Sequence, residues 1–394
     1  MTPGWRGRLA LLVLQATPFC NLDCRYCYLP DRGDRRRMSA EVLDATLSKV
    51  FAAGLPAAEL SIVWHAGEPT AIEPAWYERA FAQVARHAGA HPVQHHFQTN
   101  AVLIDDSWCS FFRQHRVRVG VSIDGPHRLH DAQRVGRDGR GTHDKVMRGI
   151  ARLRAAGVPF TTICVLTRES LAHADEVFDF FATLGAESVG FNVEEAEALH
   201  ASSSLMASGA EAQFRRFFAR IVERWRAAGE MPRLREIESV KARLRRGDYG
   251  HARGEAQNQA GEILNVAFDG GFSTWSPELL GTRHPRFDSF VLGNVLHDDL
   301  PPTVWPGAAA AAREEIAAGV RRCRADCKYF DLCLGGAPAN KLGEHGRFDV
   351  TETMHCRLTQ QAVADGVLDM LAAQYLAPPA TPAAAEAAEA DTGA

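Results

Sequence analysis

The stretch Cys20-Asn-Leu-Asp-Cys24-Arg-Tyr-Cys27 places three cysteines within eight residues, directly after an apolar run over residues 8–16. The run has the length and composition of a buried strand, so the cysteines lie on the loop that follows it. A loop this short can wrap three thiolates around one metal centre. Zinc usually takes two separate pairs of ligands, whereas three thiolates suit an iron–sulfur cube with one open iron. We therefore favour an iron–sulfur cluster over zinc.

Short apolar runs alternate with amphipathic stretches from residue 8 to about residue 195. The runs fit buried strands over residues 8–16, 59–64, 93–98, 117–123, 160–166 and 188–192. The stretches between them have the period of helices, and Ser39 is a good N-cap for the first helix. Six strand–helix units in this order predict an α/β fold with a parallel sheet, either open or closed into a barrel.

The chemically distinctive residues gather where these strands end. Residues 20–27 follow the first strand, residues 65–69 the second, residues 98–100 the third and residues 122–125 the fourth. In parallel strand–helix folds, the carboxyl ends of the strands form one edge at which functional groups collect. The four segments therefore predict a single site at that edge.

The cysteine spacing, with Tyr26 as the aromatic residue before the third cysteine, resembles the motif of the radical S-adenosylmethionine (SAM) superfamily. The resemblance covers nearly the whole ordered chain. It implies a partial (β/α)6 barrel in which Cys20, Cys24 and Cys27 bind a [4Fe–4S] cluster. It also implies that the open iron chelates SAM and splits it reductively, giving a 5′-deoxyadenosyl radical that abstracts a substrate hydrogen.

The same resemblance implies a set of residues around SAM. They are Tyr26, Gly67, Glu68, Asn100, Ser122, Asp124, Arg134 and Leu166. Gly67-Glu68-Pro69 resembles a Gly-Gly-Glu-Pro segment of the family, with Ala66 in place of the first glycine. The glycine backbone can approach the methionine ammonium closely, and the glutamate can either hold the loop or accept a hydrogen bond from that charge.

Two of these residues match positions that hold the methionine carboxylate, namely Ser122 and Arg134. The fork of an arginine can bind a carboxylate at two points. Asn100 and Asp124 have two interpretations, as contacts to ribose or substrate or as caps of the following loops. Leu166 is either a wall for adenine or an ordinary core residue.

A second group of cysteines lies near the C-terminus, at Cys323, Cys327, Cys333 and Cys356. Four thiolates form a complete ligand set, and their spacing alone fits zinc and an iron–sulfur cluster equally well. The segment resembles the SPASM domain, which carries auxiliary clusters in radical enzymes that modify peptides and proteins. The resemblance implies an auxiliary [4Fe–4S] cluster here.

The segment also departs from the full SPASM pattern, which has seven cysteines and two auxiliary clusters. Ala337 replaces one expected cysteine, and residues 272–277 lack another. Both losses affect the same cluster, so we expect one auxiliary cluster. Cys109 and Cys164 lie in apolar contexts and are expected in the core.

The pattern of the chain divides it into four parts. Residues 1–200 are expected to form the barrel, residues 201–260 a helical connector and residues 261–376 the SPASM-type domain. Residues 377–394 lack core-forming side chains and are expected to be disordered. The helices of the connector either cover the fold or offer a docking surface for a leader peptide.

Two groups of SPASM enzymes resemble this chain. Anaerobic sulfatase-maturing enzymes share residues 98–100 and 122–126, but they use two auxiliary clusters. Enzymes that form cyclophanes in ribosomally made peptides share residues 64–69, 191–195 and 276–281 and the pattern Gly335-x-x-Pro338-x-Asn340-Lys341-x-x-Glu344. The second resemblance implies a peptide maturase that abstracts a Cβ hydrogen and joins that carbon to an aromatic ring. Oxidation of Cys or Ser to formylglycine is the alternative, and a cluster-bearing electron-transfer or binding protein is the non-enzymatic one.

Crosslinking needs a base for the ring proton and an acceptor for one electron. Glu278, Glu194 and Glu195 are the candidate bases, and the auxiliary cluster is the candidate acceptor. The expected partners are a precursor peptide and an external one-electron donor such as flavodoxin or ferredoxin. Because Cys20 lies near the start, we expect any leader peptide to bind the barrel, the SPASM domain or a separate protein.

Composition excludes several other classes. The net charge of −4 over 394 residues gives no reason to expect a nucleic-acid or membrane partner. No apolar run approaches the roughly 20 residues of a membrane span, and the N-terminus lacks a signal-peptide pattern. We therefore expect a cytoplasmic protein, in which nine cysteines serve metal binding rather than disulfides.

Overall fold

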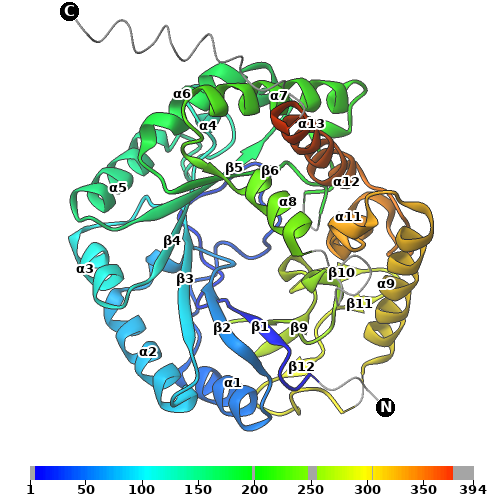
Figure 1. Cartoon of the computed structure of the whole chain (residues 1–394). Coiled ribbons are helices and arrows are strands. Elements are labelled where there is room, and N and C mark those ends of the chain that lie inside the picture. The colour runs from blue at the N-terminus through cyan, green and yellow to red at the C-terminus, as the bar shows by residue number, and fades with distance from the viewer. Residues whose placement is uncertain (1–4, 198–199, 247–254, 304, 376–394) are drawn as a thin grey trace, which may run out of the picture.

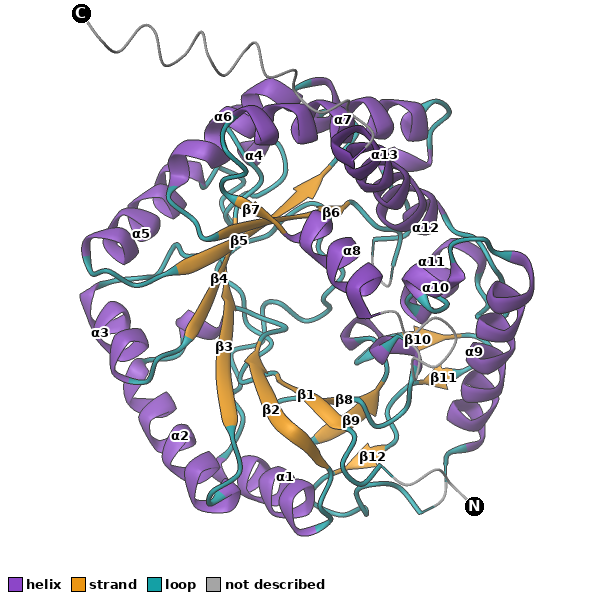
Figure 2. Cartoon of the chain, in the orientation of Figure 1, coloured by secondary structure: helices purple, strands orange, loops and turns teal. Residues whose placement is uncertain are grey.

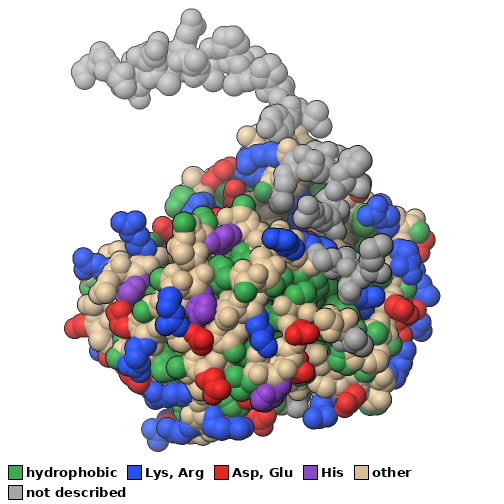
Figure 3. All heavy atoms as spheres, turned by 90° about the horizontal axis from the view of Figure 1, so that it is seen from below, with side chains coloured by type: hydrophobic (Ala, Val, Ile, Leu, Met, Phe, Trp, Pro, Cys, Tyr) green, Lys and Arg blue, Asp and Glu red, His purple; other side chains and the backbone are tan. Residues whose placement is uncertain are grey.

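The computed structural model describes residues 5–197, 200–246, 255–303 and 305–375. The tail predicted to be disordered, residues 377–394, lies outside these ranges. Within them, no helix is long and apolar enough to cross a membrane. On the face shown in Figure 3, Lys and Arg side chains are interspersed with Asp and Glu rather than separated by sign.

A parallel sheet forms the centre of the N-terminal half. Its strands follow one another in chain order: β1 (Leu9–Leu14), β2 (Pro56–Trp64), β3 (Val93–Thr99), β4 (Arg118–Ser122), β5 (Phe160–Leu166) and β6 (Ser188–Val193). Each strand pairs in parallel with the next. The strands are rich in β-branched and aromatic residues, which pack well on a pleated, covered surface. The predicted α/β fold with six strand–helix units is confirmed.

Helices cover the outer face of this sheet (Figures 1 and 2). They are α1 (Ala40–Ala52), α2 (Pro74–Ala88), α3 (Asp106–Gln114), the short α4 (His127–Asp131), α5 (His143–Ala155) and α6 (Ala174–Leu184). Ser39 caps α1 as predicted, because its hydroxyl accepts a hydrogen bond from the Val42 amide at 3.1 Å. Figure 1 shows the strands in an arc with the helices outside it, which is a partial (β/α)6 barrel.

The connector contains α7 (Ala210–Ala227), β7 (Arg233–Leu234) and α8 (Arg235–Arg246). β7 pairs in parallel with β6 and extends the sheet by one strand. The apolar side of α7, including Phe214 and Trp225, is buried. This helix contacts α6 and the C-terminal α13 (Val363–Tyr375). Of the two interpretations of the connector, α7 therefore takes the first, that of a covering helix.

The C-terminal part continues the same sheet on the other side of β1. β8 (Ile263–Val266) pairs in parallel with β1, and β9 (Gly271–Thr274) pairs with β8 in an antiparallel hairpin. β12 (Gly293–Asn294) pairs with β9, which completes a ten-stranded sheet. β10 (Arg283–His284) and β11 (Asp288–Ser289) form a separate ribbon.

Helices complete the C-terminal part and close the remaining side of the arc (Figure 1). They are α9 (Gly307–Asp326), α10 (Phe330–Cys333), α11 (Pro338–His345), α12 (Met354–Cys356) and α13, with a π-helical segment (Arg357–Ala362) between the last two. Short 3-10 turns lie at Pro69–Ala71, Ser170–Ala172, Ser204–Met206, Ala256–Asn258 and Pro277–Leu279. A second apolar core around Trp275, Phe290 and Phe348 packs against α9 and α11.

Candidate active site

A cavity of about 250 Å³ lies where the carboxyl ends of β1 to β6 meet. Most of the residues predicted for the site line it, namely Cys20, Cys24, Tyr26, Cys27, Gly67, Glu68, Asn100, Ser122, Arg134, Glu195 and Glu278. Glu278 comes from the C-terminal part, directly after β9, and the other residues come from the barrel. The convergence of the strand ends on one site is therefore confirmed.

The loop that carries the three cysteines is held to the loop between α4 and α5. The Asp23 amide donates to the Val135 carbonyl at 2.8 Å, and the Arg25 amide donates to the Gln133 carbonyl at 3.0 Å. Burial raises the pKa of the Cys20 thiol to about 12. Such a thiol becomes a thiolate only when a metal takes the place of its proton.

The number of thiols at this cavity fits a cluster with an open iron. Cys20, Cys24 and Cys27 are the three cysteines that line it. Structural zinc usually takes four protein ligands, whereas a cluster with one open iron takes three thiolates. Three thiols beside a polar cavity are the donors that an open-iron cluster requires.

The loop after β2 depends on two residues with left-handed or glycine-only backbone. Gly67 has a φ of +143°, and a Cβ there would lie 2.0 Å from the Thr17 carbonyl oxygen, so only glycine fits. Ala66, which stands where the family has another glycine, has a φ of +64°. Its carbonyl accepts a hydrogen bond from Gln15 at 2.6 Å. Gly67 thus allows close packing against the strand-one loop.

Glu68 ties the loops after β2 and β3 together. Its carboxylate is 2% exposed and accepts hydrogen bonds from the Thr70 amide and hydroxyl, the Thr99 hydroxyl and the Asn100 amide. These donors occupy both oxygens. Of the two roles predicted for Glu68, the structure shows the one in which it holds the loop.

Asn100 and Ser122 each face the cavity from a strand end. The Asn100 amide nitrogen donates to the Asn21 side-chain oxygen at 2.8 Å, which ties β3 to the cysteine loop. The Ser122 hydroxyl accepts a hydrogen bond from the Gln98 amide nitrogen at 2.9 Å. Both side chains are thereby fixed beside the thiols.

A buried polar cluster supports another part of the cavity wall. Arg134 is 8% exposed, and its Nε lies 3.1 Å from Oδ2 of Asp124, which is 1% exposed. The Tyr26 hydroxyl donates to the same carboxylate, and the Val165 amide donates to its other oxygen at 3.0 Å. Asp124 does not line the cavity. It positions Arg134 and Tyr26, so the direct contact suggested for Asp124 is replaced by a supporting role.

Leu166 takes the core position of its two interpretations. It is fully buried and packs in the main apolar core. Side chains alternate across a strand, so the residues on the opposite face of β5, Ile163 and Val165, line the cavity instead. Leu166 therefore does not line the cavity.

Glu194, one of the three candidate bases, points away from the cavity. Its carboxylate accepts hydrogen bonds from the Ser204 amide at 2.7 Å and the Ser204 hydroxyl, and it lies 3.3 Å from the His200 ring. These contacts fix the loop after β6. Glu194 holds local structure and does not reach the cavity.

Glu195 lies in the cavity wall but is already paired. Burial opposes its ionisation, yet the nearby His355 ring at 3.4 Å and a hydrogen bond from Asn340 lower the pKa of Glu195. A carboxylate with a lowered pKa is a weak base. Its negative charge instead raises the pKa of the nearby carboxyl groups of Glu278 and Glu197.

Glu278 combines the properties of a general base. Its Oε2 is buried and has no hydrogen-bond partner among the described residues. Burial, together with the negative charge of Glu195, raises the pKa of Glu278 to about 7. A base works best when its pKa lies near the working pH.

Sequence reasoning missed two further groups at this place, Glu197 and Tyr28. Glu197 Oε2 and the Tyr28 hydroxyl are buried without a hydrogen-bond partner in the described ranges. Burial, and for Glu197 also the charge of Glu195, raises the pKa of both groups. Glu197 is two positions from Glu195, a spacing that could have suggested a shared face.

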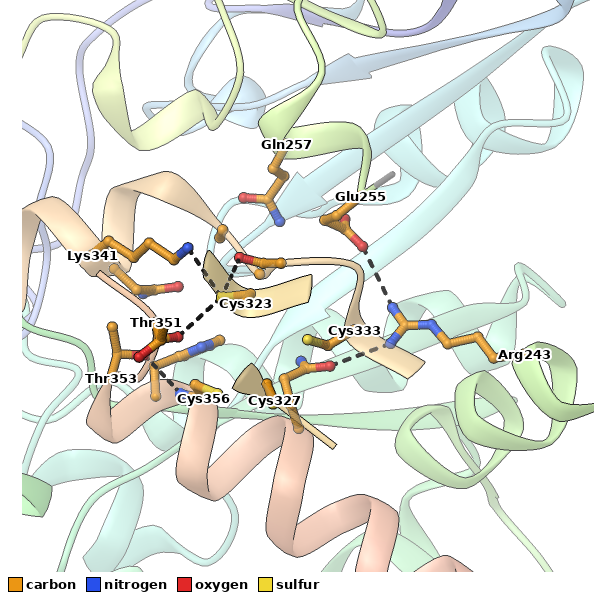
Figure 4. A pocket seen from close by; sticks show the side chains of 16 residues that line it. Arg243, Glu255, Gln257, Cys323, Cys327, Cys333, Lys341, Thr351, Thr353 and Cys356 are labelled. Carbon is orange, nitrogen blue, oxygen red and sulfur yellow. Dashed lines mark hydrogen bonds and ion pairs between the residues drawn. The ribbon is translucent and has the colours of Figure 1, made fainter. Parts of the chain in front are cut away.

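The four C-terminal cysteines line a second cavity of about 180 Å³ (Figure 4). Cys323 lies in the last turn of α9, Cys327 follows that helix, Cys333 ends α10 and Cys356 ends α12. Burial raises the pKa of Cys356 to about 12 and also raises the pKa of Cys323 and Cys333. The predicted grouping of these four cysteines is confirmed.

The remaining cysteines, Cys109 and Cys164, are buried in the apolar core, as predicted. All nine cysteines lie within the described ranges and are free thiols. The other seven cysteines thus form two groups, one at each cavity. Ala337 and the segment 272–277 stand where the full pattern would need cysteines.

Comparison with known proteins identifies the family. A family model described as "Radical SAM superfamily" matches residues 14–181. A serine-type anaerobic sulfatase-maturating enzyme of Klebsiella aerogenes is 30% identical over 84% of this chain and 80% of its own length. The chain belongs to the radical SAM superfamily. An uncharacterized protein of Synechocystis is 37% identical over 93% of this chain and 92% of its own length.

Solved structures support the fold of this radical SAM protein. Native anSMEcpe with bound AdoMet (S-adenosylmethionine) superposes with a TM-score of 0.75 at 21% identity, over 92% of this chain and 98% of that chain. Streptococcus suis SuiB bound to precursor peptide SuiA gives a TM-score of 0.61 at 15% identity, over 88% and 76%. SAM and [4Fe–4S] clusters are the cofactors of this radical SAM enzyme, and the chain supplies thiols for them at both cavities.

Proposed function

We propose that this radical SAM enzyme crosslinks a ribosomally made precursor peptide, joining an aromatic ring carbon to a Cβ of a nearby residue. The observation that carries the proposal is the buried, unpartnered carboxylate of Glu278 in the wall of the cysteine cavity. A crosslink of this kind removes a hydrogen atom from Cβ and then a proton and an electron from the ring. A base in the wall of the radical cavity meets the second need.

Cys20, Cys24 and Cys27 would hold the SAM-binding cluster, and Arg134 and Ser122 would hold the methionine carboxylate. When bound, the cluster and SAM supply the reductive cleavage that produces the hydrogen-abstracting 5′-deoxyadenosyl radical. The side chains of the protein contribute by positioning the cofactor-binding residues. Glu68 and Asn100 fix the loops around the cysteines, and Asp124 fixes Arg134, so that a single Cβ–H can lie in reach.

Glu278 would remove the ring proton after the new carbon–carbon bond forms. Its raised pKa makes the carboxylate a stronger base than an exposed glutamate. The unpartnered Oε2 is the atom that would accept the proton. The four thiols of Cys323, Cys327, Cys333 and Cys356 would hold the auxiliary cluster that takes the electron, and a flavodoxin- or ferredoxin-like protein would supply the electron for SAM cleavage.

A third cavity gives a peptide room to reach Glu278. It has a volume of about 430 Å³ and shares Glu197 and Glu278 with the cysteine cavity. Pro30, Leu279 and Leu342 contribute apolar wall. An extended peptide lying in this cavity would present one side chain past Glu278. Streptococcus suis SuiB, which has been solved with its precursor peptide, supports the peptide as a substrate class.

Oxidation of Cys or Ser to formylglycine is the second candidate function. It is favoured by the 30% identity to the serine-type anaerobic sulfatase-maturating enzyme of Klebsiella aerogenes. The two candidates begin with the same Cβ–H abstraction, and they differ in whether a ring is attacked. Both reactions then release a proton and an electron, so Glu278 and the auxiliary cluster would serve either, and the modified peptide itself distinguishes them.

The deciding experiment uses the reconstituted enzyme with SAM, dithionite and two synthetic peptides. One peptide carries aromatic residues two positions before Cβ-bearing polar residues, and the other is a sulfatase-type peptide with a target Cys or Ser. We expect the first to lose two hydrogens and to resist fragmentation between the joined residues. An aldehyde on the second peptide, trapped with a hydrazine reagent, together with an unchanged first peptide would replace crosslinking with formylglycine formation.

A further inference from the structure

The polar residues of α11 connect the two cysteine cavities. Asn340 donates a hydrogen bond to Glu195 in the wall of the first cavity. The neighbouring Lys341 donates to Cys323 Sγ in the second cavity at 3.5 Å. Glu344 accepts hydrogen bonds from the Met354 and His355 amides, just before Cys356. The short helix α11 thus contacts Glu195, which lies beside the candidate base, places Lys341 against Cys323, and holds the turn before Cys356.

Lys341 is the unusual member of this set. It is 5% exposed, and within the described ranges no carboxylate lies within 4.0 Å of its ammonium group. Its hydrogen-bond acceptor is the Cys323 sulfur (Figure 4). Gly319 makes room for it, because a Cβ at that position would lie 3.1 Å from Nζ. A buried ammonium without an anionic partner is strongly unfavourable, so the site implies a negative group beside it.

The other charged side chains in the second cavity are neutralised. Arg243 pairs with Glu255 at 3.5 Å and also donates to the Leu332 carbonyl. His355 pairs with Glu195 at 3.4 Å. Among the cations that line this cavity, Lys341 therefore has no described carboxylate partner, and its ammonium group contacts the Cys323 thiol.

We propose that Lys341 raises the reduction potential of the auxiliary cluster and so makes it an effective acceptor of the substrate electron. The proposal rests on the assignment of a cluster to the four C-terminal cysteines. A cube with four thiolates carries net negative charge, and accepting one electron adds another negative charge. A fixed positive charge at hydrogen-bond distance from a ligand sulfur stabilises the reduced form more than the oxidised form. A higher potential favours transfer of the electron from the crosslinked substrate.

The test is a redox titration of the full-length chain carrying Cys20→Ala, Cys24→Ala and Cys27→Ala, so that only the auxiliary cluster gives an EPR signal. Lys341→Met removes the charge and keeps the length of the side chain. We expect the ratio of reduced to oxidised cluster at a fixed potential to fall at least tenfold, a shift of about 59 mV to lower potential. Lys341→Arg keeps the charge and should keep the potential, as should the exposed control Lys145→Met.

Iron analysis of the same samples separates this inference from the function on which it rests. If the triple cysteine variant that keeps Lys341 binds zinc instead of iron, the C-terminal site holds no auxiliary cluster, and both the electron acceptor and this inference are overturned. Bound iron with an unchanged potential in Lys341→Met would overturn the role of Lys341 alone. If Lys341→Met loses its iron, Lys341→Gln is titrated in its place. Loss of iron from both uncharged variants, with iron kept by Lys341→Arg, would make Lys341 a structural residue and also overturn the redox role.

Discussion

The two cysteine cavities differ in what surrounds their thiols. In the first, three thiols share the wall with Arg134, Ser122 and unpartnered carboxyl groups, and the ligand set lacks a fourth cysteine. In the second, four thiols line a smaller cavity with a buried lysine. An incomplete set of thiols leaves a metal position for another ligand, whereas a complete set leaves none. Under the proposed function, bond breaking would take place at the first site and electron storage at the second.

Removing thiols gives the largest expected effect. Cys24→Ala should abolish SAM cleavage, whereas the double variant Cys327→Ala and Cys333→Ala should still release 5′-deoxyadenosine but yield no crosslinked peptide. Chromatography of 5′-deoxyadenosine and peptide mass measure the two activities. Iron should fall from about eight per chain to about four in either variant. Crosslinking by the double variant, with zinc bound in the wild type, would make the second site structural.

Removing the proposed base, Glu278, is expected to give the second-largest effect. It tests whether proton removal takes place at the first site. Glu278→Gln should lower the rate of crosslinking by at least about 100-fold, the usual range for loss of a general base. SAM cleavage should continue, because Glu278 is not expected to touch the methionine group. The exposed control Glu314→Gln should leave both rates unchanged. Equal crosslinking rates in Glu278→Gln and wild type would exclude this carboxylate as the base.

The same variant has a pH signature. Burial raises the pKa of Glu278 to about 7, so the carboxylate form that acts as a base is present above that pH. The crosslinking rate should therefore rise from pH 6 to pH 8 in the wild type. The folded state favours the protonated carboxyl, so its contribution to stability is lost as the pH rises toward 7. Glu278→Gln should then unfold at a higher temperature than the wild type at pH 8, and the difference should shrink at pH 5.

Replacing Arg134, the proposed binding partner of the methionine carboxylate of SAM, is expected to have a moderate effect. Arg134→Lys keeps the charge beside Asp124 but loses the planar fork. The KM for SAM should rise roughly tenfold, which corresponds to about 1.4 kcal/mol of binding energy. Uncoupled SAM cleavage at varied SAM concentration measures it, with the exposed Arg148→Lys as the control. An unchanged KM would confine Arg134 to supporting Tyr26 and the cysteine loop.

The smallest effect concerns the backbone of the first site. Ala66 has a φ of +64°, a region in which a Cβ is unfavourable. Ala66→Gly should raise the free energy of unfolding by about 1 kcal/mol without a change in SAM cleavage. Urea denaturation measures this change. Ala53→Gly is the control, because Ala53 has an ordinary φ of −79° and gains no relief from glycine.

Much of the fold could be predicted from the sequence because the local period and the caps agree with the tertiary structure. The strand ends and the cysteine spacing also located both cavities. For Leu166 the sequence left two interpretations open, and the alternation along β5, which puts Ile163 and Val165 in the cavity, decides for the core position.

Other site properties depend on contacts between distant segments. Glu278 and Glu195 are far apart in the chain, and only packing of the C-terminal part against the barrel gives Glu278 its raised pKa. The burial of Lys341 against Cys323 arises in the same way. A sequence pattern cannot tell a buried carboxylate from a solvated one.

The strand β1 lies between β2 and β8, so the barrel and the C-terminal part are joined by a shared row of backbone hydrogen bonds. A protein engineer who removed the C-terminal part would leave the apolar edge of Leu9–Leu14 unpaired and open to aggregation. Exchange of C-terminal parts between enzymes of this kind therefore requires a matching β8 register. In this chain the partner strand is Ile263–Val266, and a graft that preserves it would keep the spacing between the two cysteine sites.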